Sequence, residues 1–304
     1  MFKKPNHFRK RGLIITPQKN LWWMKTHAMT PALERLDGSH CKIYFSGRDD
    51  KNRSHIGFAI VDLAHPEIVL QYSSEPVLGL GELGCFDDNG VTPSSIVKVG
   101  NKTHLYYIGW NPGSTVRMHL FGGLAISTDN GRSFIRYSRA PILERSRVDP
   151  FLNTAPYALF EDGQWSMYYV SCEGWVHKDL PRYNIKYATS QDGLVWERLG
   201  HVCIDFASTD ENALARPFVI REDGIYKMWF AHKGAEYHMG YAESLDGKLW
   251  QRKDDFAGLA PSPPGNWDSD MVEYAAVTLF EGRKIMFYNG NNYGHGGIGL
   301  ATEE

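Results

Sequence analysis

Aromatic and apolar residues recur along the chain at a nearly constant spacing. Five short apolar segments, bounded by polar and turn residues, have an aromatic residue at their centre: Tyr44, Tyr106, Tyr168, Trp229 and Phe287. The steps between these five residues are 62, 62, 61 and 58 positions. Self-similarity at a fixed period is the signature of a repeat architecture, in which each copy is one supersecondary unit. The pattern therefore predicts five copies of one unit made of short strands.

Two further strand patterns run in phase with the aromatic one. Ahead of each aromatic strand stands an apolar run, built around Thr30-Pro31, Thr92-Pro93, Ala155-Pro156, Arg216-Pro217 or Tyr274-Ala275. Behind each stands a small-residue strand that holds Ala59, Ala125, Ala188, Ala242 or Ala301. In three copies a tight turn follows, at Asn130-Gly131, Asp192-Gly193 or Asp246-Gly247. Because these dipeptides tolerate positive φ, they are strong hairpin signals, and each copy is predicted to form four antiparallel strands.

Five such units in series predict an all-β fold, a five-bladed β-propeller with four antiparallel strands per blade. The last copy stops after its third strand, at residues 299–302, and the spare strand lies at the other end, at residues 13–16. We expect the N-terminal strand to complete the last blade and close the ring, because closure removes exposed sheet edges. No linker or composition shift divides the chain, so residues 1–304 are predicted to form a single domain.

Composition excludes several classes of function. A net charge of −2 gives no case for nucleic acid, and no apolar run approaches the roughly 18 residues of a membrane span. The basic start (Lys3, Lys4, Arg9, Lys10 and Arg11) precedes no cleavage site, so we expect a cytoplasmic protein. The four cysteines lie far apart without C-x-x-C spacing, which favours reduced thiols over zinc. The histidines show no paired ligand spacing either, so neither a metal nor another cofactor is expected.

The connections between the predicted strands form two sets. Strands one and two of each copy are joined by short turns: Asp37-Gly38, Gly100-Asn101, Asp162-Gly163, Asp223-Gly224 and Gly282-Arg283. Strands two and three are joined by longer polar and aromatic segments, at residues 48–53, 110–119, 173–182, 232–238 and 289–295. In a propeller these longer loops share one rim, here called the loop rim, with the links between blades. Because binding residues concentrate in loops on a rigid scaffold, we expect the loop rim to be the binding face.

The links between blades bring carboxyl groups to the loop rim. We predict that Asp88, Glu211 and Asp270 are catalytic, because they come from separate blades that hold acids apart on two sides of a bond. One of the three should be protonated at neutral pH, its pKa raised by burial or by a like charge. Neighbouring Asp87, Asp268 and Glu273 are the alternatives if the register is shifted. The competing interpretation is that such acids are solvated or cap turns.

The other residues of the loop rim indicate the chemistry of the ligand. Aromatic rings suit the apolar faces of sugars, and the rim has Trp110, Trp175, Tyr183, Tyr237, Trp267, Tyr274 and Tyr293. Arginine forks bind phosphate or carboxylate, and the rim has Arg48, Arg53, Arg117, Arg182, Arg216 and also Lys233. A carbohydrate or sugar-phosphate ligand is therefore predicted. Its expected binding residues are His27, Arg48, Asp49, Arg53, His55, Asp87, Trp110, Asn111, Trp175, Arg216, Lys233, Asp268, Glu273, Tyr274, Asn289 and Asn291.

The repeated pattern Ala-x-Ser-x-Asp-Gly-x-x-Trp, at residues 188–196 and 242–250, resembles that of five-bladed glycoside-acting proteins. These are the group around glycoside hydrolase families 32, 43, 62, 68 and 130, and the resemblance covers essentially the whole chain. Six further segments are similar to propellers associated with bacterial surface-glycan gene clusters. They are His27-Ala-x-x-Pro31, Ser46-Gly-Arg48-Asp49 with Arg53-Ser54-His55, residues 86–91, Tyr107-Ile-Gly-Trp110-Asn111, residues 267–271 and Tyr288-Asn289-Gly290-Asn291.

The resemblance implies an enzyme that acts at a glycosidic bond, by hydrolysis or by transfer to a glycan or phosphate acceptor. Families 32 and 43 carry an aspartate on the first inner strand, where this chain has no acid at residues 25–31. They also carry an acid close before a late inner-strand proline, where this chain reads Ala215-Arg216-Pro217, and Glu273 takes the comparable place one blade later. The family's catalytic triad therefore does not transfer residue by residue. A non-catalytic glycan-binding propeller is the alternative, and a scaffold for protein partners is a third.

Overall fold

The fold consists almost entirely of β-strands, as the repeat predicts. The computed structural model describes residues 5–304, so Lys3 and Lys4 of the basic start lie outside the described residues. The helical segments in the described part are a 3-10 turn, η1 (Asp254–Phe256), and one short helix, α1 (Asn291–Gly294). Within the same residues, no helix is long and apolar enough to cross a membrane.

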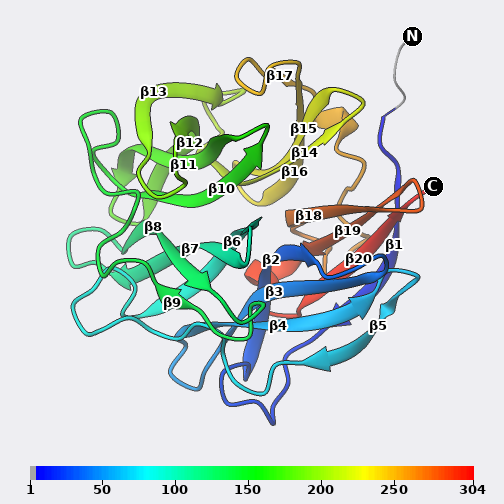
Figure 1. Cartoon of the computed structure of the whole chain (residues 1–304). Helices are drawn as coiled ribbons and strands as arrows, with labels where there is room; N and C mark the ends of the chain where they lie inside the picture. The colour runs from blue at the N-terminus through cyan, green and yellow to red at the C-terminus, as the bar shows by residue number, and fades with distance from the viewer. Residues whose placement is uncertain (1–4) are drawn as a thin grey trace.

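The strands of residues 5–304 form five antiparallel groups of four, arranged around a common centre (Figure 1). Group 1 is β2 (Thr26–Arg35), β3 (His40–Arg48), β4 (Ser54–Asp62) and β5 (His65–Tyr72). Group 2 is β6 (Gly90–Val99), β7 (Lys102–Pro112), β8 (Met118–Ser127) and β9 (Ile135–Arg136). Group 3 is β10 (Asn153–Glu161), β11 (Gln164–His177), β12 (Leu180–Ser190) and β13 (Glu197–Ile204). Group 4 is β14 (Ala213–Glu222), β15 (Ile225–Lys233), β16 (Tyr237–Ser244) and β17 (Gln251–Arg252). Group 5 is β18 (Glu273–Phe280), β19 (Arg283–Asn289), β20 (Ile298–Glu303) and β1 (Phe8–Ile15).

Neighbouring groups meet along their first strands, which lie nearest the centre. Strand β2 packs against β6, β6 against β10, β10 against β14, β14 against β18, and β18 against β2. Groups 1 to 4 are also joined by single parallel pairings: Ser54 with Gly90, Phe121 with Asn153, and Tyr183 with Ala213. Group 5 forms a separate four-stranded sheet. The arrangement is propeller-like, and the first strands surround a central space.

The N-terminal strand belongs to the last group, although it is the first strand of the chain. Strand β1 pairs antiparallel with β20, from Phe8 opposite Glu303 to Ile15 opposite Ile298. The sequence predicted this strand at residues 13–16, and the observed strand begins earlier, at Phe8. The added residues include Lys10, whose ammonium lies 2.6 Å from a carboxylate oxygen of Asp268 in the link before β18.

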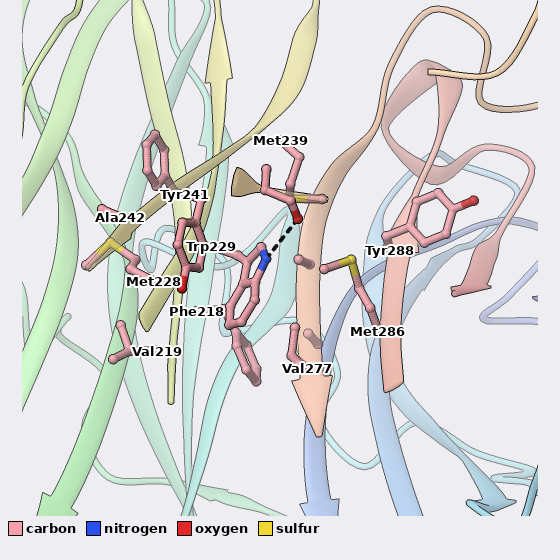
Figure 2. Packing of buried hydrophobic residues seen from close by; sticks show 14 of the residues in the cluster. Phe218, Val219, Met228, Trp229, Met239, Tyr241, Ala242, Val277, Met286 and Tyr288 are labelled. Carbon is pink, nitrogen blue, oxygen red and sulfur yellow. Dashed lines mark hydrogen bonds between the residues drawn. The ribbon is translucent and has the colours of Figure 1, made fainter. Parts of the chain in front are cut away.

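The repeated aromatic residues form the core of the groups, as their spacing predicted. Tyr44, Tyr106, Tyr168, Trp229 and Phe287 are each no more than 1% exposed. Figure 2 shows Trp229 of group 4 between its own strands and group 5, near Val277. The indole N–H of Trp229 donates to the Ala257 carbonyl over 3.2 Å, so even this buried polar atom is satisfied. The period in the sequence is therefore a period of core packing between neighbouring groups.

The first strand of each group is irregular at the position of the repeated dipeptide. The pairing register shifts there in all five groups. In four groups the residue at the shift has a positive φ: Thr30, Ala155, Arg216 and Tyr274. Such a conformation is uncommon for residues other than glycine, and β-bulges change the direction of side chains beside functional sites. The bulges therefore determine which side chains of the first strands point toward the centre of the molecule.

Candidate functional site

A cavity of about 420 Å³ opens at the loop rim, and all five groups contribute to its wall. Groups 1 and 2 supply Met29, Thr30, Arg48, Thr92, Ile108, Trp110, Arg117, Met118 and Leu120. Groups 3 to 5 and their loops supply Asp179, Leu180, Pro181, Tyr183, Asn212, Lys233, Tyr237, Tyr274 and Tyr293. This volume lies within the range of small-molecule sites, about 300–1,000 Å³. Arg48, Trp110, Lys233 and Tyr274 were among the predicted binding residues.

Three cationic side chains face this cavity. The Arg48 guanidinium donates to the Asn52 side-chain oxygen over 2.9 Å, and its buried Nε has no hydrogen-bond partner among the described residues. Burial lowers the pKa of Arg48, which shows that the guanidinium is poorly solvated. Lys233 donates to the Tyr293 hydroxyl over 3.2 Å and lies over the Tyr237 ring. Arg117 is exposed at the edge.

No carboxylate among residues 5–304 forms an ion pair with the Arg48 or Lys233 side chain. The one acidic residue in the described wall of the cavity is Asp179, which is exposed. The wall therefore carries three cations and a single carboxylate. This imbalance favours an anionic group in the cavity, because partly buried cations are stabilised by a negative charge at close range.

Four tyrosines form the part of the wall next to Lys233. The hydroxyls of Tyr183 and Tyr237 share a short hydrogen bond. The Tyr237 ring lies 5.9 Å from the Tyr274 ring and 6.2 Å from the Tyr293 ring, measured between centroids. Burial raises the pKa of Tyr183 to about 12 and raises the pKa values of Tyr237 and Tyr274 well above their usual range. These phenols are therefore neutral at physiological pH and can donate hydrogen bonds to a ligand.

One buried carboxyl group lies behind the tyrosines. Glu273 begins β18, is fully buried, and neither of its oxygens makes an ordinary hydrogen bond within the described part of the chain. It interacts with the Tyr274 hydroxyl beside it, although the geometry falls short of a regular hydrogen bond. Burial raises the pKa of Glu273 well above its usual value, against the opposing effects of Tyr274 and of the Lys233 ammonium. Burial therefore favours the protonated form of Glu273 more than that of a solvent-exposed carboxyl group.

Arg216, predicted as a binding residue, has another role. Its side chain is buried, and its guanidinium donates to the carbonyls of Pro31 over 3.0 Å and Pro93 over 2.6 Å. It therefore ties the first strands of groups 1, 2 and 4 together across the centre. Burial lowers the pKa of Arg216 to about 10, so it stays charged at neutral pH. Arg216 thus joins three groups at the centre of the molecule and is not a residue of the described cavity wall.

The acids in the links between groups follow a repeated structural scheme. Asp87, Asp149 and Asp268 are each no more than 1% exposed. Each accepts a hydrogen bond from a tyrosine of the second strand and a charged one from the fourth strand of its own group. The partners are Tyr107 and Arg136 for Asp87, Tyr169 and Arg198 for Asp149, and Tyr288 and Lys10 for Asp268. Asp87 and Asp268, both predicted as binding residues, thus hold the outer strand of a group in place and lie outside the described cavity wall.

Glu211 takes the same position in group 4. It pairs with the Arg252 guanidinium at 2.6 Å and with the His232 ring at 2.9 Å. Burial alone would raise the pKa of Glu211, but hydrogen bonds from Arg252, His232 and the Ala207 N–H together lower it to about 2. Glu211 is therefore ionised at neutral pH, in contrast to the protonated carboxyl expected of a general acid.

The structure does not bring the three predicted catalytic carboxyls together at the cavity. Asp88 is half-buried and accepts from the Gly84 N–H, and Asp270 is exposed and accepts from the Ser269 hydroxyl. Neither of them nor Glu211 belongs to the cavity wall formed by the described residues. Glu211 is turned into group 4 by its contacts with Arg252 and His232, whereas Asp88 and Asp270 make local contacts within their links.

Asp49, Arg53 and His55 form a closed cluster inside the loop between β3 and β4. The Asp49 carboxylate accepts from the Arg53 guanidinium at 2.9 Å and lies 3.2 Å from the His55 ring. Its other oxygen accepts the backbone N–H groups of Lys51 and Arg53. These contacts order the loop that follows Arg48, the last residue of β3. The three residues therefore support the site instead of lining the described cavity, in contrast to the prediction.

The remaining predicted residues also have structural partners. Asn289 is buried and bonds to Ala28, Gly297 and the Thr30 N–H, which joins group 5 to the bulge of β2. Asn291 accepts from two backbone N–H groups of the link before β18. Three predicted residues remain. The ring of His27 lies against His295, and Asn111 donates a hydrogen bond to the Cys85 carbonyl. Trp175 is half-buried. Burial, with the charges of Arg48 and His295, lowers the pKa of His27 to about 3.

Some wall residues carried only a weak signal in the sequence. Arg117, Tyr183, Tyr237 and Tyr293 stood out as rim residues, but nothing in the pattern separated them from rings of the core. Asn212 and the apolar residues Met29 and Leu180 carried no signal. Among the described residues, no cluster of three histidine, cysteine or acidic side chains has the arrangement of a metal site.

Comparison with known proteins places this fold and site in context. The protein is 42% identical over 299 residues to the uncharacterized protein Rv1502 of Mycobacterium tuberculosis, with 98% of this chain and 99% of that protein covered. The chain belongs to the family of Rv1502. No family model matches it.

Solved structures with the same fold include glycoside hydrolases. The BT0996 RGII complex superimposes with a TM-score of 0.77 and 18% identity, covering 99% of this chain and 92% of that one. A thermostable family-43 glycoside hydrolase gives a TM-score of 0.65 and 16% identity, covering 92% and 89%. This member of the Rv1502 family thus shares the fold of the glycoside hydrolase propellers, as the sequence resemblance implied.

Proposed function

We propose that this protein is a carbohydrate-active enzyme that acts at a glycosidic bond of an anionic sugar held in the central cavity. The observation that carries the proposal is the wall itself, in which Arg48, Arg117 and Lys233 face a single exposed carboxylate. A uronate carboxylate or a sugar phosphate supplies the missing negative charge. The reaction is hydrolysis, or transfer to a glycan or phosphate acceptor on the same site.

We infer that the five strand groups are the five blades of one closed domain. The cyclic packing of the first strands supports a ring, since β18 packs against β2 as each other first strand packs against the next. The pairing of β1 with β20 supports closure by the N-terminal strand. A closed ring fixes the distances between loops of different blades, and this rigidity is what a preorganised binding site needs.

The aromatic part of the wall supports a sugar as the ligand. Trp110 and the tyrosines present rings and hydroxyls to the cavity, and the Trp110 N–H is held by the Ser54 hydroxyl at 3.0 Å. Sugar rings have apolar C–H faces edged by hydroxyls, which match such a surface. A non-catalytic glycan-binding propeller would use the same wall. The buried Glu273, which has no ion pair and a raised pKa, favours the enzyme, because a binding module has no need of a buried acid.

The substitution Arg48→Ala tests the anionic ligand. We expect it to weaken binding of glucuronic acid, galacturonic acid or glucose 1-phosphate by more than about tenfold, the scale of one charge-assisted contact of roughly 1.5–3 kcal/mol. Binding of glucose should change little. Isothermal titration of the unaltered protein and the variant measures both. Arg132→Ala, an exposed arginine on a short turn, is the matched control.

Tight binding of neutral sugars alone, unaffected by Arg48→Ala, would refute the anionic ligand. Turnover of glycosides then separates the enzyme from the binding module. A bell-shaped pH profile indicates two titrating groups, whereas a binding module shows no turnover at any pH.

A further inference from the structure

The Glu273–Tyr274 pair is the one place in the described structure where a buried, unpaired acid meets the wall of the cavity. Successive side chains of a regular strand point to opposite faces. Here the register of β18 shifts between Glu273 and Ala276, and Tyr274 has a φ of 58°. The bulge therefore lets two consecutive side chains serve the same site, with the tyrosine at the cavity and the glutamate behind it.

We propose that the Tyr274 hydroxyl protonates the leaving oxygen of the glycosidic bond and that Glu273 is the positioning residue that replaces this proton. The inference rests on the proposed function, because it assigns the proton donor of that same reaction. Tyr274 touches the ligand, since it lines the cavity. Glu273 acts through Tyr274, since it is fully enclosed.

The step conserves protons and electrons. As the bond from the anomeric carbon to the leaving oxygen breaks, its electron pair goes to that oxygen, which takes the hydroxyl proton of Tyr274. The Tyr274 oxygen takes the carboxyl proton of Glu273, so the phenol is restored and a carboxylate remains. Water, or an acceptor hydroxyl, adds to the anomeric carbon and releases a proton. That proton restores the Glu273 carboxyl.

The surroundings of the pair suit this role. A phenol alone is a weak acid, and the raised pKa of Tyr274 makes it weaker still, so it needs a proton source behind it. Glu273 keeps its proton because it is buried. The charged and titratable groups that act on the pair come from six elements and one loop: Lys233 at the end of β15, Glu236 in the loop after it, Tyr183 from β12, Tyr237 from β16, Tyr293 from α1, Arg48 from β3 and Arg216 from β14. Lys233 stabilises the carboxylate that forms in the step, because it lowers the pKa of Glu273 against the effect of burial.

The imperfect contact between the two side chains is consistent with the proposal. Catalytic hydrogen bonds are often long or poorly aligned in the absence of substrate and tighten in the complex. A purely structural acid would have a cation and a tyrosine as partners, as Asp87, Asp149 and Asp268 have, although one oxygen of Asp87 also lacks a hydrogen bond among the described residues. Glu273 is the exception among the buried link acids, and the exception stands at the cavity.

The test uses leaving groups of different acidity. Methyl and 2,4-dinitrophenyl glycosides of glucuronic and galacturonic acid, in both anomers, are supplied to the full-length protein. A dinitrophenolate leaves without a proton, whereas methoxide requires one. We expect Tyr274→Phe to lower kcat on methyl glycosides by about 10²–10⁴ and Glu273→Gln by at least about tenfold, with dinitrophenyl glycosides affected little. Tyr226→Phe and Glu161→Gln, a hydrogen-bonded pair far from the wall, are the controls and should change neither rate.

The pH profile and a spectroscopic signal separate positioning from structure. The alkaline limb of kcat/KM that reports loss of the Glu273 proton should disappear in Glu273→Gln. The infrared stretch of a protonated carboxyl group, present in the unaltered protein at neutral pH, should disappear with it. Equal losses on both classes of leaving group, or an unchanged infrared signal, would overturn the proton-donor assignment while leaving the proposed function in place. Failure of the unaltered protein to cleave any of the glycosides would refute both.

Discussion

At the scale of the residue, burial and partners decide what a carboxyl group does in this protein. Asp149 is buried with two cations and a tyrosine and holds strands together. Glu211 is buried with Arg252 and His232, and its pKa falls to about 2. Glu273 is buried with no ion pair, and its pKa rises. The sequence predicted all of these acids near one rim. It could not distinguish their roles, because their partners come from distant parts of the chain.

The opposite shifts of Glu273 and Glu211 predict opposite effects on stability. Because the pKa of Glu273 is higher in the folded protein, the unfolded chain releases this proton at a lower pH. The contribution of Glu273 to the free energy of unfolding is therefore complete below the unfolded pKa and is lost as the pH rises through the folded pKa. Glu273→Gln should therefore gain stability relative to the unaltered protein as the pH rises above the unfolded pKa of 4.5. Glu211 stabilises the folded protein fully above its unfolded pKa of 4.5, and this stabilisation is lost as the pH falls toward its folded pKa of about 2. Glu211→Gln should therefore be destabilised by about 3 kcal/mol at pH 7 and much less near pH 2.

Urea denaturation of the three proteins across this pH range measures both effects. Each unit of pKa difference is worth about 1.4 kcal/mol, which is well within reach of the method. If the two variants respond to pH with the same sign, the assignment of a protonated Glu273 is refuted.

At the scale of the element, the link acids explain how a two-residue strand such as β9 or β17 is held in place. These strands make few backbone pairings, so most of their anchoring comes from charged side chains: Arg136 reaches Asp87, and Arg252 reaches Glu211. The same acids anchor the link that precedes the group. In groups 2 to 5, one buried carboxylate of the preceding link therefore joins the second strand of the group to its last strand.

Removing one of these carboxylates should destabilise the protein strongly. Asp149→Asn keeps the size of the side chain but leaves Lys186 and Arg198 buried without their acid, which should cost about 3–5 kcal/mol. Glu82→Gln breaks only the exposed pair with Arg139 and should cost no more than about 1 kcal/mol. The midpoints of urea denaturation at pH 7 measure the difference. Equal midpoints for the two variants would contradict the anchoring role.

At the scale of the whole molecule, the two ends of the chain meet in group 5. The β1–β20 pairing and the contact of Lys10 with Asp268 give this group a fourth strand of the same kind as the others. The contact joins residues 258 positions apart. Strand β18 packs against β14 on one side and against β2 on the other. The cavity therefore keeps its shape only while group 5 stays folded.

Deletion of residues 1–16 should leave the protein poorly soluble or easily unfolded. The truncation removes β1, exposes the edge of β20, and leaves Asp268 buried without its cation. Deletion of residues 1–4 spares β1 and is the matched control. Soluble yield and thermal midpoint are the measurements. A truncated protein as soluble and as stable as the control would show that the N-terminal strand does not hold the fold together.

The repeat, the strand pattern, the aromatic core and the loop rim could all be predicted from the sequence. These features depend on local periodicity and on turn residues such as Asp-Gly, whose preferences act within a few positions. Which rim residues face the cavity, and which acid keeps its proton, became visible only in three dimensions. Desolvation and Coulomb interactions depend on distances in space, and the decisive pairs, such as Asp87 with Arg136 and Asp268 with Lys10, are 49 and 258 positions apart. Of the three predicted catalytic acids, Glu211 is buried against Arg252 and His232, and Asp88 and Asp270 stay in their links, whereas Glu273 is the buried acid without an ion pair beside the cavity.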